Sequence, residues 1–301
     1  MQKQKLTFST FKELTKLEFS LFALPFVLTG ALIPFAKFDF FFNFRVIEAL
    51  RFLWIVPAFM AARLSGMAFN QLIDCKIDAK NARTKERPIP SGRATPQQAG
   101  MIAWGCLFAF VLMCAFINKS CFYLGLIAAF LIVLYSYMKR IHMVCHFVLG
   151  SIHFLGPVMA AAVLTGGVEK TAVLLGLMSG LSISATDIAW AIQDVSFDVK
   201  EKLHSIPARL GAERSLWVAR GAHLFVVLFF YLLCTKGGFP RICLWGPILL
   251  IGLYVRFHRR LAAALKEKAI ERIPSLFFNC NVSVPLIVLF FVIVGVIWGS
   301  A

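Results

Sequence analysis

Residues 121–165 read Cys121-Phe-Tyr-Leu-Gly-Leu-Ile-Ala-Ala-Phe-Leu-Ile-Val-Leu-Tyr135-Ser-Tyr-Met-Lys139-Arg140-Ile-His-Met-Val-Cys-His146-Phe-Val-Leu-Gly-Ser-Ile-His-Phe-Leu-Gly-Pro157-Val-Met-Ala-Ala-Ala-Val-Leu-Thr165. Its charged residues are Lys139 and Arg140, which stand next to each other near the middle. A helix that crosses a bilayer needs about 20 mainly apolar residues. The stretch therefore predicts two membrane-spanning helices, 121–138 and 143–165, that reverse direction at a short basic turn.

The whole chain has the same character. Of its 301 residues, 59% are hydrophobic and 15% are charged, whereas a soluble domain has about 45–50% and about 25%. This composition excludes an ordinary soluble enzyme and a disordered chain. The net charge of +16 does not indicate nucleic-acid binding, because such binding requires a basic face exposed to water.

Apolar segments of sufficient length recur along the chain. They predict an all-α, polytopic integral membrane protein with about nine transmembrane helices. No linker or soluble region interrupts the series, so we expect a single membrane domain over residues 1–301. The predicted spans are 18–36, 47–69, 99–117, 121–138, 143–165, 171–192, 215–235, 242–258 and 282–300.

The distribution of Lys and Arg predicts the orientation of these spans. With the N-terminus in the cytoplasm, 22 of the 31 basic residues fall in cytoplasmic segments and seven in outer segments. Loops on the cytoplasmic side carry such an excess. We therefore expect a bacterial-type inner (plasma) membrane protein with its N-terminus inside.

Five of the six aspartates form two clusters on the cytoplasmic side. Asn70, Asp74 and Asp78 are spaced by four residues, so they share one face of a helix. Asp187, Asp194 and Asp198 are offset by seven and eleven residues, which also places them on one face. Asp39 lies apart, and we assign it no role.

Carboxylates grouped near hydrocarbon require a compensating cation. Ordinary salt bridges from Lys76 and Lys80 are one solution. Paired aspartate clusters fit Mg²⁺ better, because Mg²⁺ binds through one or two carboxylates and substrate phosphates. The spacing therefore predicts a Mg²⁺–diphosphate site.

Basic residues near the clusters are candidates for phosphate contacts. Arg suits phosphate through its planar fork, and Lys acts as a point charge. Arg63 lies inside a span, while Lys139 and Arg140 follow Tyr135. His142 and His146, four residues apart, are interpreted as polar residues at the membrane interface. The other candidates near the first cluster are Arg83, Lys85 and Arg87.

These motifs resemble those of the UbiA superfamily of intramembrane prenyltransferases. The segment from Arg63 through Asn70-Gln-Leu-Ile-Asp74-Cys-Lys-Ile-Asp78 to Arg87-Pro88 is similar to the family's NxxxDxxxD motif and its tail. Tyr135-Ser-Tyr-Met-Lys139-Arg140 and Asp194-Val-Ser-Phe-Asp198 resemble two further family elements. The resemblance implies nine helices around a central cavity. The opening Lys16-Leu-Glu-Phe and Leu203-His-Ser-Ile-Pro207 favour the 4-hydroxybenzoate polyprenyltransferase-like branch of quinone biosynthesis.

The sequence also departs from the family pattern. Asn81-Ala82-Arg83 stands where Asn-Pro-Arg is usual, Trp190 where Tyr is usual, and Lys202 where Gly is expected. No aspartate is lost, so these changes bear on substrate choice and loop geometry rather than on catalysis.

The resemblance implies that a polyprenyl group moves from an allylic polyprenyl diphosphate to an aromatic acid, 4-hydroxybenzoate or a hydroxynaphthoate. Asp74, Asp78, Asp194 and Asp198 would be catalytic and, with Asn70, would hold Mg²⁺. Arg140 would bind the aromatic carboxylate, and Asp194 would contact the aromatic hydroxyl. Tyr135, Tyr137 and Trp190 would line the cavity. The remaining substrate-binding candidates are Arg63, Arg83, Arg87, Lys139 and Asp187, of which Arg63, Arg87 and Lys139 would bind phosphate oxygens.

Other functions remain open at this point. A transporter or channel also carries acids within the membrane, although it favours positions near the midplane. A prenyltransferase with a different acceptor, for haem, chlorophyll or a vitamin, fits the same motifs. The sequence indicates a lipid-bilayer environment and predicts no nucleic-acid partner and no obligate protein partner. It does not define the length of the prenyl chain or distinguish the ubiquinone route from the menaquinone route.

Overall fold

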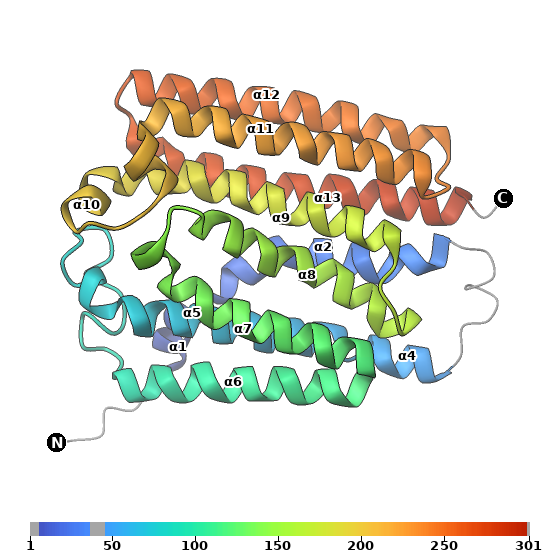
Figure 1. Cartoon of the computed structure of the whole chain (residues 1–301), viewed down its shortest axis with the longest axis horizontal. Helices are drawn as coiled ribbons and strands as arrows, with labels where there is room; N and C mark the ends of the chain where they lie inside the picture. The colour runs from blue at the N-terminus through green and yellow to red at the C-terminus, as the bar shows by residue number, and fades with distance from the viewer. Residues whose placement is uncertain (1–5, 37–45, 300–301) are drawn as a thin grey trace.

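The computed structural model describes residues 6–36 and 46–299, and these residues contain helices but no strand. The long α-helices run roughly along the long axis of one bundle (Figure 1). Their bounds are α1 Phe8–Thr15, α2 Ser20–Leu32, α4 Val46–Phe52, α5 Ile55–Asp78, α6 Pro96–Ile117, α7 Lys119–Ile141, α8 Cys145–Thr165, α9 Lys170–Ala191, α10 Val195–Lys200, α11 Ile206–Lys236, α12 Trp245–Lys266 and α13 Ile273–Gly299. Short 3₁₀ segments extend or join them at Leu17–Phe19, Ile33–Ala36, Ile192–Asp194, Arg241–Leu244 and Ile270–Arg272.

Eight helical segments within the described residues are long and apolar enough to cross a membrane. The all-helical, multi-span fold predicted from the sequence is therefore confirmed. The predicted span 242–258 forms α12, which packs beside α11 and α13. It is not among the eight, and its second half carries Arg256, Arg259 and Arg260. Asp39 and the basic residues of segments 1–5 and 37–45 lie outside the described residues.

Several helices extend beyond their predicted spans on the side of the aspartate clusters. α5 continues to Asp78, and α9 continues through a 3₁₀ turn into α10. α11 begins at Ile206, where Ser205 caps it by accepting a hydrogen bond from the Ala208 N–H and Pro207 stands in the first turn. A capping Ser followed by Pro is a strong start signal. Both clusters therefore lie at one end of the bundle, with the loop after α5 and with α10 (Figure 1).

Helices α8 and α9 approach each other so closely that their backbones touch. A Cβ atom on Gly150 would lie 2.6 Å from the Gly180 carbonyl oxygen, and a Cβ atom on Gly180 would lie 2.6 Å from the Gly150 carbonyl oxygen. Ser184 also donates from α9 to the His146 carbonyl oxygen of α8 at 3.1 Å. Small residues at helix contacts allow this packing within membranes. The contact fixes the two helices that flank the second aspartate cluster.

The short helix α1 is anchored across the end of α5. The buried Gln71 side chain donates to the carbonyl oxygens of Glu13 and Leu14 at 2.9 and 2.8 Å. Arg93, in the loop before α6, forms an ion pair with the Glu13 carboxylate at 2.7 Å. Hydrogen bonding from Arg93 lowers the pKa of Glu13 below its ordinary value.

Replacing Glu13 by Gln is expected to cost less than about 1 kcal/mol at neutral pH, because both partners are well exposed to solvent. A lowered carboxyl pKa stabilises the folded chain above the unfolded pKa of about 4.3 and is lost as the pH falls through the folded value. Thermal unfolding of both proteins in detergent should therefore differ slightly at pH 7 and converge at about pH 3.

Candidate active site

The two aspartate clusters lie together around one polar cavity of about 150 Å³. α5 supplies the first cluster from its last three turns, and α9, the 3₁₀ turn and α10 supply the second. The 3₁₀ turn replaces the regular helix assumed in the sequence analysis, yet all three aspartates still reach the cavity. The lining includes Asn70, Asp74, Asp78, Asn81, Arg83, Thr84, Arg87, Tyr135, Lys139, Asp187, Trp190, Asp194 and Asp198.

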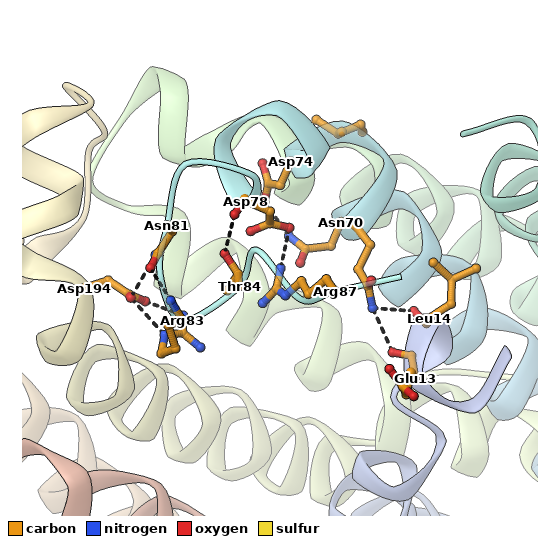
Figure 2. A network of polar contacts seen from close by, with 12 residues as sticks. Glu13, Leu14, Asn70, Asp74, Asp78, Asn81, Arg83, Thr84, Arg87 and Asp194 are labelled. Carbon is orange, nitrogen blue, oxygen red and sulfur yellow. Dashed lines mark hydrogen bonds and ion pairs between the residues drawn. The ribbon is translucent and has the colours of Figure 1, made fainter. Parts of the chain in front are cut away.

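Arg83 joins the two halves of this cavity. Its guanidinium binds both carboxylate oxygens of Asp194, Nε to Oδ1 at 2.9 Å and Nη2 to Oδ2 at 2.5 Å. Asn81 adds a hydrogen bond to Asp194 Oδ1 at 3.3 Å (Figure 2). A bidentate pair of this kind is stronger and more directional than a single contact. The loop after the first cluster is thereby fixed to the second cluster.

The carboxylates of the first cluster are also paired with arginines. Arg87 Nη1 lies 2.7 Å from Asp78 Oδ2 (Figure 2). Arg140 Nη2 lies 2.8 Å from Asp74 Oδ1, and Asn70 donates to Asp74 Oδ2 at 3.0 Å. Salt bridges from Lys76 and Lys80 were the alternative to a metal site, but within the described residues neither lysine pairs with these aspartates, and Lys80 instead pairs with the half-buried Glu201 at 2.6 Å.

The end of α7 supports the same cavity. Lys139 lines it, and the Lys139 carbonyl oxygen accepts a hydrogen bond from the His204 backbone N–H at 2.6 Å. Ser205 Oγ donates to Asp198 Oδ2 at 2.8 Å. Ser205 and Asn81 were not predicted as site residues. The capping position of Ser205 before Pro207 is the signal that identifies it.

The interpretation of His146 as an interfacial residue is wrong. His146 is fully buried on α8, and its Nδ1 lies 2.7 Å from Asp187 Oδ2. The Ile206 backbone N–H donates to Nε2 at 3.3 Å. Since Nε2 acts as an acceptor it carries no proton, so Nδ1 is the atom that donates to Asp187. His146 thus orients a carboxylate at the edge of the polar cavity.

A second, larger cavity of about 590 Å³ adjoins the polar one. Its walls come mainly from apolar side chains of α2, α5, α6, α7 and α8. The two cavities share a border of polar and aromatic residues, so charged groups adjoin a mainly apolar space. The shared residues are Asn70, Arg83, Thr84, Arg87, Tyr135, Asp187 and Trp190.

Arg63 lies within the larger cavity, together with Tyr135 and His153. Its Nε is buried and has no hydrogen-bond partner, and no carboxylate of residues 6–36 or 46–299 pairs with it. Seven residues of helix separate it from Asn70, which corresponds to about 10 Å along α5. A buried guanidinium with an unused donor is a site for an anionic group.

Two predicted site residues lie elsewhere. Arg140 lines neither cavity, because it binds Asp74 and the carbonyl oxygens of Ser136 and Ile73. Its predicted contact with an aromatic carboxylate is therefore corrected. Tyr137 is 45% exposed on the outer face of α7 and lines neither cavity, whereas Tyr135 lines both.

The oxygen atoms around the polar cavity suit Mg²⁺ only when a substrate supplies further ligands. In the described part of the chain, no three acidic, His or Cys side chains gather closely enough to hold a metal by themselves. Carboxylate and amide oxygens nevertheless face one small cavity from two sides, beside arginines suited to phosphate. Mg²⁺ prefers this arrangement, since it takes few protein ligands and completes its shell with water and substrate phosphate. The residues fit Mg²⁺ bound together with a diphosphate.

The fold and these cavities together describe one class of protein. It is a polytopic membrane protein in which a cavity lined by acidic and basic residues adjoins an apolar cavity. The model of the UbiA prenyltransferase family matches residues 23–281. The chain therefore belongs to the UbiA prenyltransferase family and is an integral membrane protein with multiple spans.

Two kinds of enzyme are similar to this chain in sequence. The chain is 31% identical over 170 residues to digeranylgeranylglyceryl phosphate synthase from Methanosarcina mazei, covering 54% of this chain and 56% of that protein. It is 28% identical over 209 residues to 4-hydroxybenzoate octaprenyltransferase from Legionella pneumophila strain Lens, covering 65% and 73%. The matched region thus spans little more than half of the first relative's length.

Solved structures share the fold. A UbiA homolog from Aeropyrum pernix K1 superposes with a TM-score of 0.77 at 24% identity, covering 92% of this chain and 98% of that one. A UbiA homolog from Archaeoglobus fulgidus, solved bound to GPP and Mg²⁺, gives a TM-score of 0.67 at 17% identity, covering 92% and 99%.

Proposed function

We propose that this protein transfers a polyprenyl group from an allylic polyprenyl diphosphate to a small aromatic acid in a Mg²⁺-dependent reaction. The observation that carries the proposal is the junction of the two cavities. A chamber of carboxylates and arginines suits a metal-bound diphosphate, and the adjoining apolar space of about 590 Å³ suits a prenyl chain.

Asn70, Asp74, Asp78, Asp194 and Asp198 are the residues that would hold Mg²⁺. When bound, Mg²⁺ neutralises charge on the diphosphate as the C–O bond breaks. The bound state of the Archaeoglobus fulgidus homolog supports this cofactor by analogy of fold.

The basic residues around the chamber bind and orient the diphosphate. Arg83 and Arg87 line both cavities, so they reach phosphate oxygens at the point where the prenyl chain begins. Lys139 adds a point charge from α7, which also lines the polar cavity. The apolar walls of the larger cavity hold the chain and exclude water, which would otherwise capture an allylic cation.

The acceptor is held where Arg63 faces the larger cavity. Arg63 replaces Arg140 as the proposed partner of the acceptor's anionic group, because Arg63 lies in the cavity with an unused donor and Arg140 does not. Asp187 lines both cavities and is oriented by His146. It is placed to accept a hydrogen bond from the acceptor's hydroxyl group. Asp194, for which the sequence predicts this role, has both oxygens bound by Arg83.

A glyceryl phosphate is the second candidate acceptor. The similarity to the Methanosarcina mazei synthase favours it, and Arg63 would bind its phosphate as readily as a carboxylate. The similarity to the Legionella octaprenyltransferase and the Leu203–Pro207 motif favour 4-hydroxybenzoate or a dihydroxynaphthoate, in ubiquinone or menaquinone biosynthesis.

The aspartate end of the bundle is proposed to face the cytoplasm of a bacterial-type inner membrane. The basic residues of the loop after α5, the α10 region and the end of α12 support this orientation through the excess of positive charge on the cytoplasmic side. One membrane domain over residues 1–301 would carry the whole site.

Purified protein in detergent should be incubated with Mg²⁺, farnesyl diphosphate or geranylgeranyl diphosphate, and each acceptor in turn. Prenylated 4-hydroxybenzoate or dihydroxynaphthoate, identified by mass spectrometry with equimolar diphosphate release, is the expected result. If glyceryl phosphate is the only acceptor that yields a prenylated product, the second candidate is established. Turnover that continues undiminished in EDTA would contradict the proposed Mg²⁺ dependence.

Replacing Arg63 by Gln is expected to raise the KM for the acceptor by about 10–100-fold, because a charge-assisted hydrogen bond worth about 1.5–3 kcal/mol is lost. The KM for the prenyl diphosphate should change by less than about threefold. Steady-state kinetics with each substrate varied separately measures both values. An equal rise in both KM values would place Arg63 at the diphosphate instead.

A further inference from the structure

Arg83 and Arg87 each have two possible partners, an aspartate and the diphosphate. Their guanidinium groups bind Asp194 and Asp78, and the same side chains line the cavity assigned to the diphosphate. Asp194 and Asp78 are in turn two of the proposed metal ligands. The two arginines proposed to bind the diphosphate are thus paired with two aspartates proposed to bind the metal ion.

These pairings leave little of Asp194 available to a metal ion. Oδ1 accepts hydrogen bonds from Arg83 Nε and Asn81 Nδ2, and Oδ2 accepts one from Arg83 Nη2. The Asp194 side chain is 7% exposed, so water does not weaken the pairing strongly. A divalent cation that arrives alone must displace a bidentate guanidinium from this largely buried carboxylate, whereas the Arg83 side chain itself is 35% exposed and can turn toward an incoming anion.

We propose that Arg83 and Arg87 are exchangeable counter-ions that couple metal binding to diphosphate binding. Before substrate arrives, they neutralise Asp194 and Asp78. An incoming diphosphate draws both guanidinium groups onto its oxygens and frees the carboxylates for divalent cations. This inference rests on the proposed function, and it adds a rule about the order of binding at that site.

The exchange replaces both Arg–Asp ion pairs and leaves no charge unpaired. Each Arg gains a phosphate partner, and each freed Asp would be available to a metal ion. Arg140 is different, because it pairs with Asp74 but lines neither cavity, so it cannot transfer to the diphosphate. Coupling therefore belongs to Arg83 and Arg87 and not to every arginine beside an aspartate.

Coupling of this kind is reciprocal and can be measured without turnover. Mn²⁺, used in place of Mg²⁺, is titrated into the purified full chain and its binding is followed by EPR. The titration is repeated with geranyl S-thiolodiphosphate, an analogue that resists cleavage, and each is compared with a protein-free titration. The wild-type protein is expected to bind Mn²⁺ at least about tenfold more tightly with the analogue, which lies within the usual range of coupling between sites.

Replacing Arg83 by Gln is expected to tighten the binding of Mn²⁺ alone by several fold and to weaken the binding of the analogue. The ratio of the Mn²⁺ affinities with and without the analogue should fall towards one. Arg87→Gln should act in the same direction and covers the case in which Arg83→Gln fails to fold. Thermal unfolding of each variant confirms that it is folded. Lys80→Gln is the matched control, since it removes one positive charge from the same region at a side chain that is 60% exposed and lines neither cavity.

The inference is overturned if wild-type protein binds Mn²⁺ equally well with and without the analogue. It is also overturned if Arg83→Gln and Arg87→Gln leave the affinity for Mn²⁺ alone unchanged or weaken it, or if Lys80→Gln tightens it to the same extent. If the wild-type enzyme transfers prenyl groups but shows no coupling between Mn²⁺ and the analogue, only the proposed counter-ion exchange is contradicted. If the enzyme shows neither prenyl transfer nor an effect of the analogue on Mn²⁺ binding, the proposed function itself is contradicted.

Discussion

Replacing Asp194 by Asn is expected to lower the rate of prenyl transfer at least about thousandfold while the protein remains folded. Asn keeps the size of the side chain and the hydrogen bond from Arg83 to one oxygen, but it removes the negative charge. A metal that acts as Lewis acid contributes several kcal/mol to the transition state, and each 1.36 kcal/mol corresponds to a tenfold change in rate. Single-turnover measurements with saturating Mg²⁺ and substrates would give the loss directly.

The matched control is Glu201→Gln, which makes the same change from acid to amide just beyond α10. Glu201 pairs with Lys80 near the surface and lines neither cavity. Its replacement should leave the rate within about twofold, because a surface ion pair contributes less than about 1 kcal/mol. The metal-ligand role of Asp194 is wrong if Asp194→Asn retains more than about a tenth of wild-type activity.

The first aspartate cluster could be predicted from the sequence because all of its members lie on one helix. Asn70, Asp74 and Asp78 follow the period of α5, so their common face depends only on helix geometry. The second cluster is less regular, since the 3₁₀ turn Ile192–Asp194 interrupts the helix. Its convergence with the first cluster depends on how α2 and α8 hold α5 and α9 in the bundle, which spacing alone does not define.

The partners of the aspartates could not be predicted, because they are set by contacts between segments far apart in the chain. Arg83 reaches Asp194 across 111 residues, and His146 reaches Asp187 across 41. A sequence shows that basic residues follow the first motif, but not which carboxylate each one binds. The same limit applies to two arginines: the sequence predicts an acceptor contact for Arg140 and a phosphate contact for Arg63, but only Arg63 of the two lines a cavity.

Replacing Gly150 or Gly180 by Ala is expected to destabilise the protein by about 1–3 kcal/mol each, the usual cost of overpacking a well-packed core. The added Cβ atom would lie 2.6 Å from a carbonyl oxygen of the facing helix in both cases. Backbone atoms cannot rotate aside as a side chain can, so α8 and α9 must separate. Thermal unfolding in detergent, followed by circular dichroism, would measure the loss.

The same separation should affect catalysis, because His146 on α8 orients Asp187 on α9. Any Gly180→Ala protein that folds should therefore show a lower kcat as well as a lower melting temperature. Gly221→Ala on α11 is the matched control: its Cβ atom would meet no atom within 4 Å, and Ala favours a helix over Gly by about 1 kcal/mol. That variant should be as stable as the wild type or slightly more stable. Equal effects at Gly180 and Gly221 would mean that helix propensity, and not the contact between α8 and α9, determines the outcome.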